Sequence, residues 1–258
     1  MTPLGFPSDL QKLSVLMPAY NEAAVIIPSV QETIRTLDGF GIEYEIIVID
    51  DGSHDGTFER IHELRARHGR VIAVKNRENY GKGRALKKGF RSATGDYVVF
   101  LDCDLDLHPA QVRHFFEVMR REDVDVVIGS KRHPQSRVAY PWSRKVISSV
   151  YFFLVKLLFG LPIRDTQTGL KLFRREVLRR VFHKMLVKRY AFDLEILALA
   201  HHFHYRIAQA PVTLRPQRRR DRIRTVDIYH TLWDTLAIFY RMRVLHYYDR
   251  ISSGRHGG

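Results

Sequence analysis

The stretch VVFLDCDLD, residues 98–106, places four apolar residues directly before three carboxylates at alternate positions. A continuous apolar run of this kind is typical of a strand buried on both faces of a sheet. If the chain stays extended beyond Leu101, the side chains of Asp102, Asp104 and Asp106 project to one side. Crowded carboxylates repel one another unless a cation neutralises them, and oxygen ligands favour Mg²⁺ or Mn²⁺. The sequence therefore predicts a metal site at these three aspartates, with a solvated acidic turn as the alternative.

Strands and helices alternate on both sides of this stretch. Apolar runs predict strands at 13–18, 44–49, 71–74, 98–101 and 125–130. Helical periodicity and turn residues predict helices at 25–37, 57–67, 83–93 and 109–121. This alternation predicts right-handed βαβ crossovers and an α/β fold with a mainly parallel sheet flanked by helices.

Polar residues follow the ends of the expected strands. They are Tyr20, Glu22, Asp50, Asp51, Asp102–Asp106 and Ser130–Arg132. Ligands bind at the carboxyl edge of open α/β sheets, so these groups predict a cleft there. The turn Gly81-Lys82-Gly83 opens a helix and is a candidate phosphate cradle, although it matches no P-loop and a plain turn remains the alternative.

The composition indicates a folded chain with an anionic partner. Hydrophobic residues make up 45% of the 258 residues, which suffices for a core. The formal net charge of +14 implies nucleic acid, anionic lipid or phosphorylated substrates. The single cysteine, Cys103, excludes an intrachain disulfide and suits a reducing compartment. Anionic neighbours raise the pKa of a thiol, so we expect Cys103 to fill space and not to act as a nucleophile.

Two segments of the second half suggest a bilayer surface. Residues 137–161 mix aromatic, basic and aliphatic side chains, which suits either an ordinary core helix or the headgroup boundary of a membrane. No apolar run reaches the roughly 20 residues of a spanning helix, and the nearest, 146–163, contains Lys156 and Pro162. Residues 1–12 lack the basic-then-apolar order of a signal peptide.

The C-terminal region is basic. Residues 211–258 contain ten Arg and four Asp, a net charge of +6. An amphipathic helix is expected there, with one face formed by Tyr229, Leu232, Trp233, Leu236 and Phe239. This pattern indicates either membrane-surface binding or a helix packed on the core beside a solvated basic loop. We therefore expect a catalytic domain at 1–211 and a basic, membrane-surface region with a disordered tail at 212–258.

Six motifs in order resemble a known family. They are MPAYNE (17–22), IDDGS with DGT (49–57), NYGKG (79–83), DCDLD (102–106), GSKR (129–132) and DTQTGLK (165–171). Together they resemble family 2 glycosyltransferases of the GT-A fold, and specifically the dolichyl- or polyprenyl-phosphate sugar synthases. The resemblance extends from about residue 13 to residue 240, which makes it more specific than any single motif.

The resemblance implies a role for each motif. Five residues would hold the nucleoside of a nucleotide-sugar: Pro18, Tyr20, Glu22, Ile49 and Asp51. Asp102, Cys103 and Asp104 would line the diphosphate, while Asp104 and Asp106 would bind the metal and Arg132 would approach the phosphates. A basic pair six residues apart closes over the phosphates in the family; Arg218 and Arg224 have that spacing, and other arginines of 215–224 are alternatives.

The implied reaction is a single displacement with inversion. A polyprenyl or dolichyl monophosphate would attack a hexose of UDP-glucose or GDP-mannose at the cytoplasmic face of a membrane, with the protein bound peripherally. The acceptor phosphate is already anionic, so no strong general base is needed. Asp193 is the nearest candidate to contact the acceptor or the sugar, and Asp106 with the DTQTG motif resembles glucosyl-type members.

Two other functions remain open. A related transferase with a soluble or polysaccharide acceptor would need a general base for a hydroxyl group, and only Asp193 is a candidate. A nucleic-acid binder suits the basic charge, but carboxylates at the strand ends oppose binding of a polyanion there. We therefore expect no nucleic-acid partner.

Overall fold

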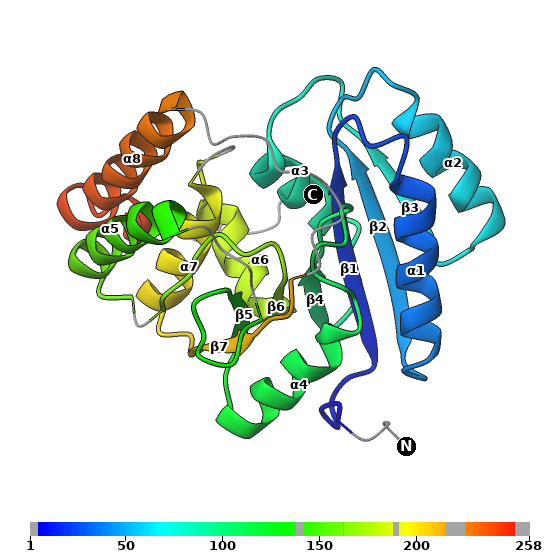
Figure 1. The fold of residues 1–258 in the computed structure, drawn as a ribbon, viewed down its shortest axis with the longest axis horizontal. Helices are drawn as coiled ribbons and strands as arrows, with labels where there is room; N and C mark the ends of the chain where they lie inside the picture. The colour runs from blue at the N-terminus through cyan, green and yellow to red at the C-terminus, as the bar shows by residue number, and fades with distance from the viewer. Residues whose placement is uncertain (1–4, 138–141, 162, 188–190, 215–224, 251–258) are drawn as a thin grey trace.

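One twisted sheet organises the chain (Figure 1). The computed structural model describes residues 5–137, 142–161, 163–187, 191–214 and 225–250. Within these residues the strands are β1 (Lys12–Ala19), β2 (Glu43–Asp50), β3 (Val71–Lys75), β4 (Tyr97–Phe100), β5 (Val126–Ser130), β6 (Lys171–Arg174) and β7 (Ile207–Pro211). Their order across the sheet is β3-β2-β1-β4-β6-β5-β7. The expected α/β fold is confirmed.

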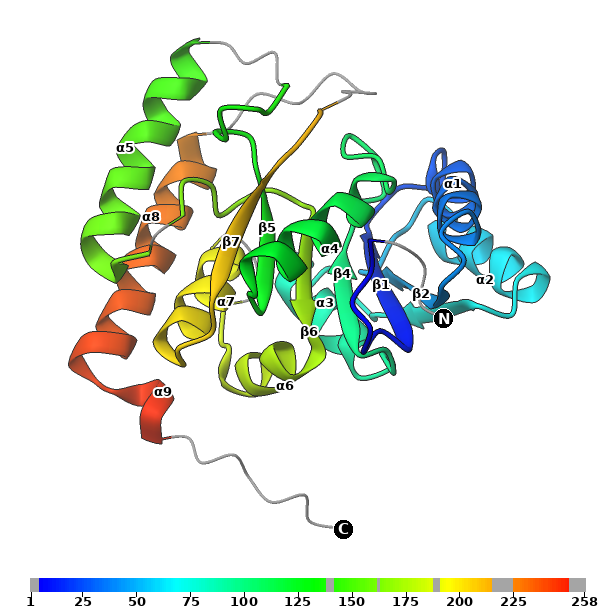
Figure 2. The same ribbon diagram turned by 90° about the horizontal axis from the view of Figure 1, so that it is seen from below.

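Helices cover both faces of the sheet (Figure 2). They are α1 (Ile26–Asp38), α2 (Thr57–Arg67), α3 (Lys82–Phe90), α4 (Gln111–Glu122), α5 (Trp142–Phe159), α6 (Arg175–Lys184), α7 (Phe192–His202), α8 (Thr225–Phe239), the π-helix η1 (Tyr240–Val244) and α9 (Tyr247–Arg250). Alternate strand residues enter two cores: Val15 and Met17 pack with α1, α2 and α4, whereas Leu16 packs on the side of α3, α6 and α7. The period-2 geometry of strands therefore produces three layers.

The sheet is parallel except at β6. β1 pairs in parallel with β2 and β4, as the alternating pattern predicts, and β5 pairs in parallel with β7. β6 lies between β4 and β5 and is antiparallel to both. Neither β6 nor β7 was expected from the sequence, because each is a short segment without a continuous apolar run.

The reversed direction of β6 brings its preceding loop to the functional edge. Lys171, the first residue of β6, lies opposite Phe100, the last residue of β4. The loop of residues 165–170 therefore reaches the edge at which β1, β2 and β4 end. A parallel strand in this place would have put the same loop at the opposite edge of the sheet.

Helices α5 and α8 lie side by side at one end of the molecule, far from α2 (Figure 1 and Figure 2). Phe159 packs edge-on against Phe239 with ring centroids 6.1 Å apart, so Phe239, one of the five residues of the predicted apolar face, packs partly against the core. The rest of the predicted face is exposed: Tyr229, Leu232, Trp233 and Leu236. In the part of the chain that the structure describes, no helix is long and apolar enough to cross a membrane.

The proposed division at residue 211 stays a prediction. Ile238 of α8, Met242 of η1 and Tyr248 of α9 are buried in the same core as α6 and α7. Most of the predicted basic loop, at 215–224, and the predicted tail from residue 254 lie outside the described residues.

Candidate active site

The loops after β1 and β2 are bound to each other at the carboxyl edge. The backbone N–H of Asn21 donates to Ser53 Oγ (2.9 Å), and the N–H of His54 donates to Asn21 Oδ1 (3.0 Å). The N–H of Glu22 donates to Thr57 Oγ1 (2.9 Å). These bonds fix the predicted nucleoside-binding loop, where Tyr20 is exposed.

The other predicted nucleoside contacts lie deeper. Pro18 is half-buried within β1. Ile49 is wholly buried, and a Cβ on Gly89 of α3 would lie only 2.5 Å from Ile49 Cγ1. The side chain of Ile49 therefore packs in the core beneath α3 and does not line the surface of the edge.

Asp51 shapes the turn that opens α3. Its buried carboxylate accepts hydrogen bonds from Asn76 Nδ2 (2.6 Å), the N–H of Tyr80 (3.2 Å) and the N–H of Gly81 (2.7 Å). Charge-assisted bonds of this kind are stronger than neutral ones. Asp51 thus holds the first turn of α3, and with it Lys82, against the end of β2.

Lys82 is the first residue of α3 and contacts the acidic stretch directly. Its Nζ lies 2.5 Å from Asp102 Oδ1. Burial alone would lower the pKa of Lys82, but the charges of Asp102, Asp193 and Asp104 outweigh burial and raise the pKa above its ordinary value. The ammonium is therefore a fixed positive charge within a group of carboxylates.

Asp102 is confined on its other side by the loop before β6. A Cβ added to Gly169 would lie 2.0 Å from Asp102 Oδ2, so only glycine permits this close approach. Burial would raise the pKa of Asp102, but Lys82, Lys171 and Lys131 outweigh it and hold the pKa below its ordinary value. Asp102 is therefore an ionised carboxylate surrounded by lysines from three parts of the chain.

The chain does not stay extended beyond Leu101, so the prediction that three aspartates project to one side of a strand is wrong. β4 ends at Phe100, and the chain turns at Leu105, whose φ of 50° is left-handed. The N–H of Asp106 donates to Asp104 Oδ1 (3.0 Å), a local bond that competes with extended structure.

The three carboxylates of this turn differ in burial. Asp106 is buried, whereas Asp104 is half-buried. Burial, and next the charge of Asp102, raises the pKa of the Asp104 carboxyl above its ordinary value. Among the residues that the structure describes, no three His, Cys, Asp or Glu side chains group as a ready-made metal cage.

The donor set nevertheless fits a divalent cation that binds together with a substrate. Mg²⁺ is usually held by one or two carboxylates plus substrate phosphates, and not by an all-protein cage. Asp102 and Asp104 supply two hard oxygen donors, and burial together with the charge of Asp102 raises the pKa of Asp104. Phosphate oxygens would have to complete the coordination, with Asp106 buried behind the turn.

A buried ion pair joins β6 to α7. Lys171 Nζ lies 2.5 Å from Asp193 Oδ1 and also donates to the carbonyl oxygen of Thr168. The side chain of Lys171 is 1% exposed and that of Asp193 10% exposed. Asp193, the sequence's candidate for an acceptor or sugar contact, therefore lies beside the acidic stretch with its charge compensated by Lys171. No sequence pattern indicates this pairing, because the partners are 22 residues apart on elements of different type.

The loop of residues 165–169 also holds the end of β5. Asp165 Oδ2 accepts from the N–H of Lys131 (3.1 Å) and from Thr168 Oγ1 (2.8 Å). Arg132 hydrogen-bonds Ser149 of α5 and lies 5.5 Å above the ring of Phe152. Arg132 is thus directed toward α5.

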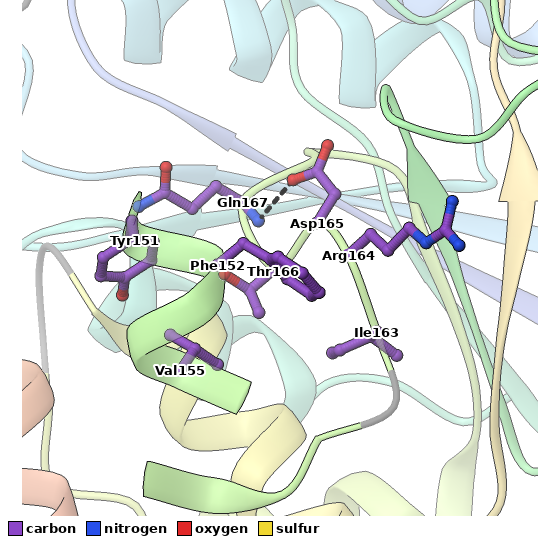
Figure 3. A pocket seen from close by; sticks show the side chains of 8 residues that line it. All are labelled: Tyr151, Phe152, Val155, Ile163, Arg164, Asp165, Thr166 and Gln167. Carbon is purple, nitrogen blue, oxygen red and sulfur yellow. Dashed lines mark hydrogen bonds between the residues drawn. The ribbon is translucent and has the colours of Figure 1, made fainter. Parts of the chain in front are cut away.

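A small pocket lies between α5 and this loop (Figure 3). Its lining combines apolar and polar side chains: Tyr151, Phe152, Val155, Ile163, Arg164, Asp165, Thr166 and Gln167. The N–H of Gln167 donates to Asp165 Oδ1 at 3.1 Å. Tyr151 Oη pairs with Thr235 Oγ1 of α8 at 3.1 Å, so the pocket adjoins the α5–α8 pair.

Cys103 has a structural role. It is buried, and its Sγ donates to the carbonyl oxygen of Pro18 at 3.3 Å. Burial, and then the charge of Asp102, raises the pKa of the thiol well above its ordinary value. Arg218 and Arg224, the predicted phosphate-closing pair, lie outside the described residues.

Comparison with known proteins identifies relatives over most of the chain. The family model "Glycosyl transferase family 2" matches residues 14–182. Glycosyltransferase AglD of Haloferax volcanii is 33% identical over 208 residues, which cover 80% of this chain and 33% of that protein. A dolichyl-phosphate beta-glucosyltransferase of Dictyostelium discoideum is 32% identical over 219 residues, covering 80% of this chain and 67% of that protein. The chain thus spans about a third of the length of the first relative.

Solved structures share the fold. Mannosyl-3-phosphoglycerate synthase from Rubrobacter xylanophilus has a TM-score of 0.68 at 18% identity, covering 96% of this chain and 78% of that one. Glucosyl-3-phosphoglycerate synthase from Mycobacterium tuberculosis, in complex with Mn²⁺, UDP and glucosyl-3-phosphoglycerate, has a TM-score of 0.63 at 25% identity. That likeness covers 89% of this chain and 79% of the other.

Replacing Lys171 by Met should lower the free energy of unfolding by about 3–5 kcal/mol, because Asp193 is left as a buried charge without its partner. Urea unfolding measures the change. Breaking the exposed Arg206–Asp123 pair with Arg206→Ala should cost less than about 1 kcal/mol. The double variant Lys171→Met/Asp193→Leu should regain most of the lost stability. If Lys171→Met and Arg206→Ala lowered the free energy of unfolding by the same amount, the assignment of Lys171–Asp193 as a buried, stabilising ion pair would be contradicted.

Proposed function

Because the chain belongs to glycosyl transferase family 2, we propose that it transfers a hexose from a nucleotide-sugar to the phosphate of a polyprenyl or dolichyl monophosphate. The observation that carries the proposal is the cluster of Lys82, Asp102 and Asp104 at the carboxyl edge. At this cluster the diphosphate of a sugar donor would contact the cationic side chain of Lys82 and a metal ion held by the carboxylates of Asp102 and Asp104. Relatives named as dolichyl-phosphate glucosyltransferases support the lipid acceptor.

The donor site would consist of the loops after β1 and β2, which are hydrogen-bonded to each other, and the turn after β4. The nucleoside would lie against the exposed Tyr20 and near Glu22, and the diphosphate would lie between Lys82 and Asp104. Asp102 and Asp104 would hold Mg²⁺ or Mn²⁺ together with phosphate oxygens. The bound cation would supply stabilisation of the charge on the departing diphosphate. The Mn²⁺ and UDP of the mycobacterial relative support this combination of ligands.

The proposed chemistry is one displacement at the anomeric carbon. An oxygen of the acceptor phosphate forms the new bond to that carbon, the bond to the donor diphosphate breaks, and the nucleoside diphosphate leaves with the electron pair. Inversion follows from attack opposite the leaving group. The second pKa of a phosphate monoester is about 6, so the acceptor is already anionic near neutral pH. Asp193, paired with Lys171, would position the sugar or acceptor and need not remove a proton.

Glucose is the hexose that the comparisons favour. Two relatives, from Dictyostelium discoideum and Trichomonas vaginalis, are named as dolichyl-phosphate beta-glucosyltransferases. Asp106 and the DTQTG loop at 165–169 agree with that type. UDP-glucose is therefore the first donor to test, with GDP-mannose as the comparison.

Basic side chains next to the cluster would bind the acceptor phosphate. Lys131 follows β5 and acts electrostatically on Asp102, and Arg132 faces α5 beside Phe152. Charge-assisted hydrogen bonds from these groups suit a monophosphate. Arginines of 215–224 would add to this charge. The acceptor would thus enter from the side of α5 and α8.

We propose that α5, α8 and η1 contact a bilayer. Their large apolar side chains are exposed: Val150, Phe153 and Leu157 on α5, Tyr229, Leu232, Trp233 and Leu236 on α8, and Tyr240 and Val244 on η1. We call this set the α5–α8 face. Aromatic and aliphatic side chains beside a net charge of +6 in residues 211–258 suit an anionic membrane surface. The single buried thiol fits a reducing compartment, so we infer the cytoplasmic side.

Purified protein with Mn²⁺, a polyprenyl phosphate and radiolabelled UDP-glucose should move label into the lipid phase. GDP-mannose should give less label. Asp104→Ala should reduce lipid labelling by at least about 100-fold, because loss of a metal-binding carboxylate removes charge stabilisation of the leaving group. Its circular dichroism spectrum should match that of the wild type.

The distribution of the label tests the acceptor, and the turnover of Asp104→Ala tests the role of this carboxylate. Label in a water-soluble product, such as a glucosylated phosphoglycerate, with none in lipid would overturn the lipid acceptor. Unchanged turnover in Asp104→Ala would overturn the assignment of this carboxylate.

Phe153→Gln and Trp233→Gln should each weaken binding to vesicles of phosphatidylcholine and phosphatidylserine by about tenfold or more, because burial of one large apolar side chain is worth about 1.5–3 kcal/mol. Vesicle flotation measures the bound fraction. Phe58→Gln on α2, at the opposite end of the molecule, is the matched control and should bind as the wild type does. Equal binding by all variants, or a stable dimer that the two substitutions dissociate, would contradict a membrane-binding face.

A further inference from the structure

The ammonium of Lys82 lies where a metal ion would have to approach. Its Nζ is 2.5 Å from Asp102 Oδ1, and Asp193 and Asp104 also attract it. The position of Lys82 is fixed from behind, because Asp51 Oδ2 accepts the N–H of Gly81 at 2.7 Å. One lysine therefore supplies the positive charge at the centre of three carboxylates.

Both carboxylate oxygens of Asp102 have a close neighbour, and its side chain is 38% exposed. Its Oδ2 lies against Gly169, where even a methyl group would come within 2.0 Å. Its Oδ1 contacts Lys82. A divalent ion that binds Asp102 would therefore meet the ammonium at the same carboxylate, and the two positive charges would repel each other at short range.

Charge balance around the turn depends on the donor. Lys171 pairs with Asp193, whereas Lys82 pairs with Asp102, beside the other carboxylates of the turn, Asp104 and Asp106. A divalent ion bound at Asp102 would bring two further positive charges close to the ammonium of Lys82. The diphosphate of a nucleotide-sugar carries negative charge that would restore the balance and offer the ammonium a new acceptor.

We propose that Lys82 is a built-in counter-cation that occupies Asp102 while the donor site is empty and yields this carboxylate to the metal only when a nucleoside diphosphate accepts its ammonium. This inference rests on the proposed function, because it requires a diphosphate donor. Metal and nucleotide then bind with positive coupling, and each raises the affinity for the other by the same factor. The Lys82–Asp102 ion pair therefore weakens the binding of the metal ion when no nucleotide is bound.

The experiment measures Mn²⁺ binding through the electron paramagnetic resonance signal of free Mn²⁺, with and without UDP. In the wild type, Mn²⁺ alone should bind weakly, and UDP should raise its affinity by about tenfold or more. Lys82→Met should bind Mn²⁺ alone several-fold more tightly than the wild type. The same variant should bind UDP in the presence of Mn²⁺ about tenfold more weakly, since a charged hydrogen bond to phosphate is lost.

Two further variants distinguish the effect of the charge at Lys82 from a general change in charge or in structure. Lys88→Met on the same helix removes an equal charge from a lysine that bonds the carbonyl oxygen of Lys75, so it should change neither affinity. Lys82→Arg retains the charge and should keep Mn²⁺ binding as weak as in the wild type. Circular dichroism shows whether each variant is folded.

The outcomes distinguish this inference from the proposed function. If the wild type binds neither UDP nor GDP in the presence of Mn²⁺, the donor assignment fails. If the wild type binds UDP with Mn²⁺ but Lys82→Met binds Mn²⁺ alone no more tightly, the counter-cation role is overturned and the donor assignment stands. A parallel loss of both affinities in Lys82→Met would likewise overturn it.

Discussion

Three aspartates follow directly on a buried strand, and their mutual repulsion has to be offset by cations. Lys82 contacts Asp102 at 2.5 Å, and the chain turns at Leu105, where the N–H of Asp106 donates to Asp104 Oδ1. Asp104 keeps a raised pKa because burial and Asp102 disfavour its charged form. Burial and the neighbouring carboxylates therefore make this edge favourable for a cation, and we propose that a metal ion binds there together with an anionic donor.

The reversed strand β6 makes this arrangement possible. Because β6 is antiparallel to β4, the loop before it reaches the edge where β4 ends, and Gly169 contacts Asp102 there. The same strand begins with Lys171, which pairs with Asp193 of α7. The strand thereby connects the donor cluster to α7, which in turn packs against α8.

Local patterns could predict the five strands that alternate with helices, because each is a continuous apolar run bounded by turn residues. They could not predict β6, which has four residues and begins with a buried lysine whose partner is distant in the chain. The turn after Asp102 was also missed, because the bond from the Asp106 N–H to Asp104 competes with extended backbone. The motif residues were found at the correct edge, but the core placement of Ile49 and the role of Asp51 in forming a turn depend on tertiary contacts.

The most direct measurement is a crystal structure of the protein with Mn²⁺ and UDP. We predict a metal ion bound to carboxylate oxygens of Asp102 and Asp104 and to diphosphate oxygens, with Lys82 Nζ moved from Asp102 to a phosphate oxygen. A metal ion and diphosphate bound away from the turn at residues 102–106, with the Lys82–Asp102 pair intact, would contradict it.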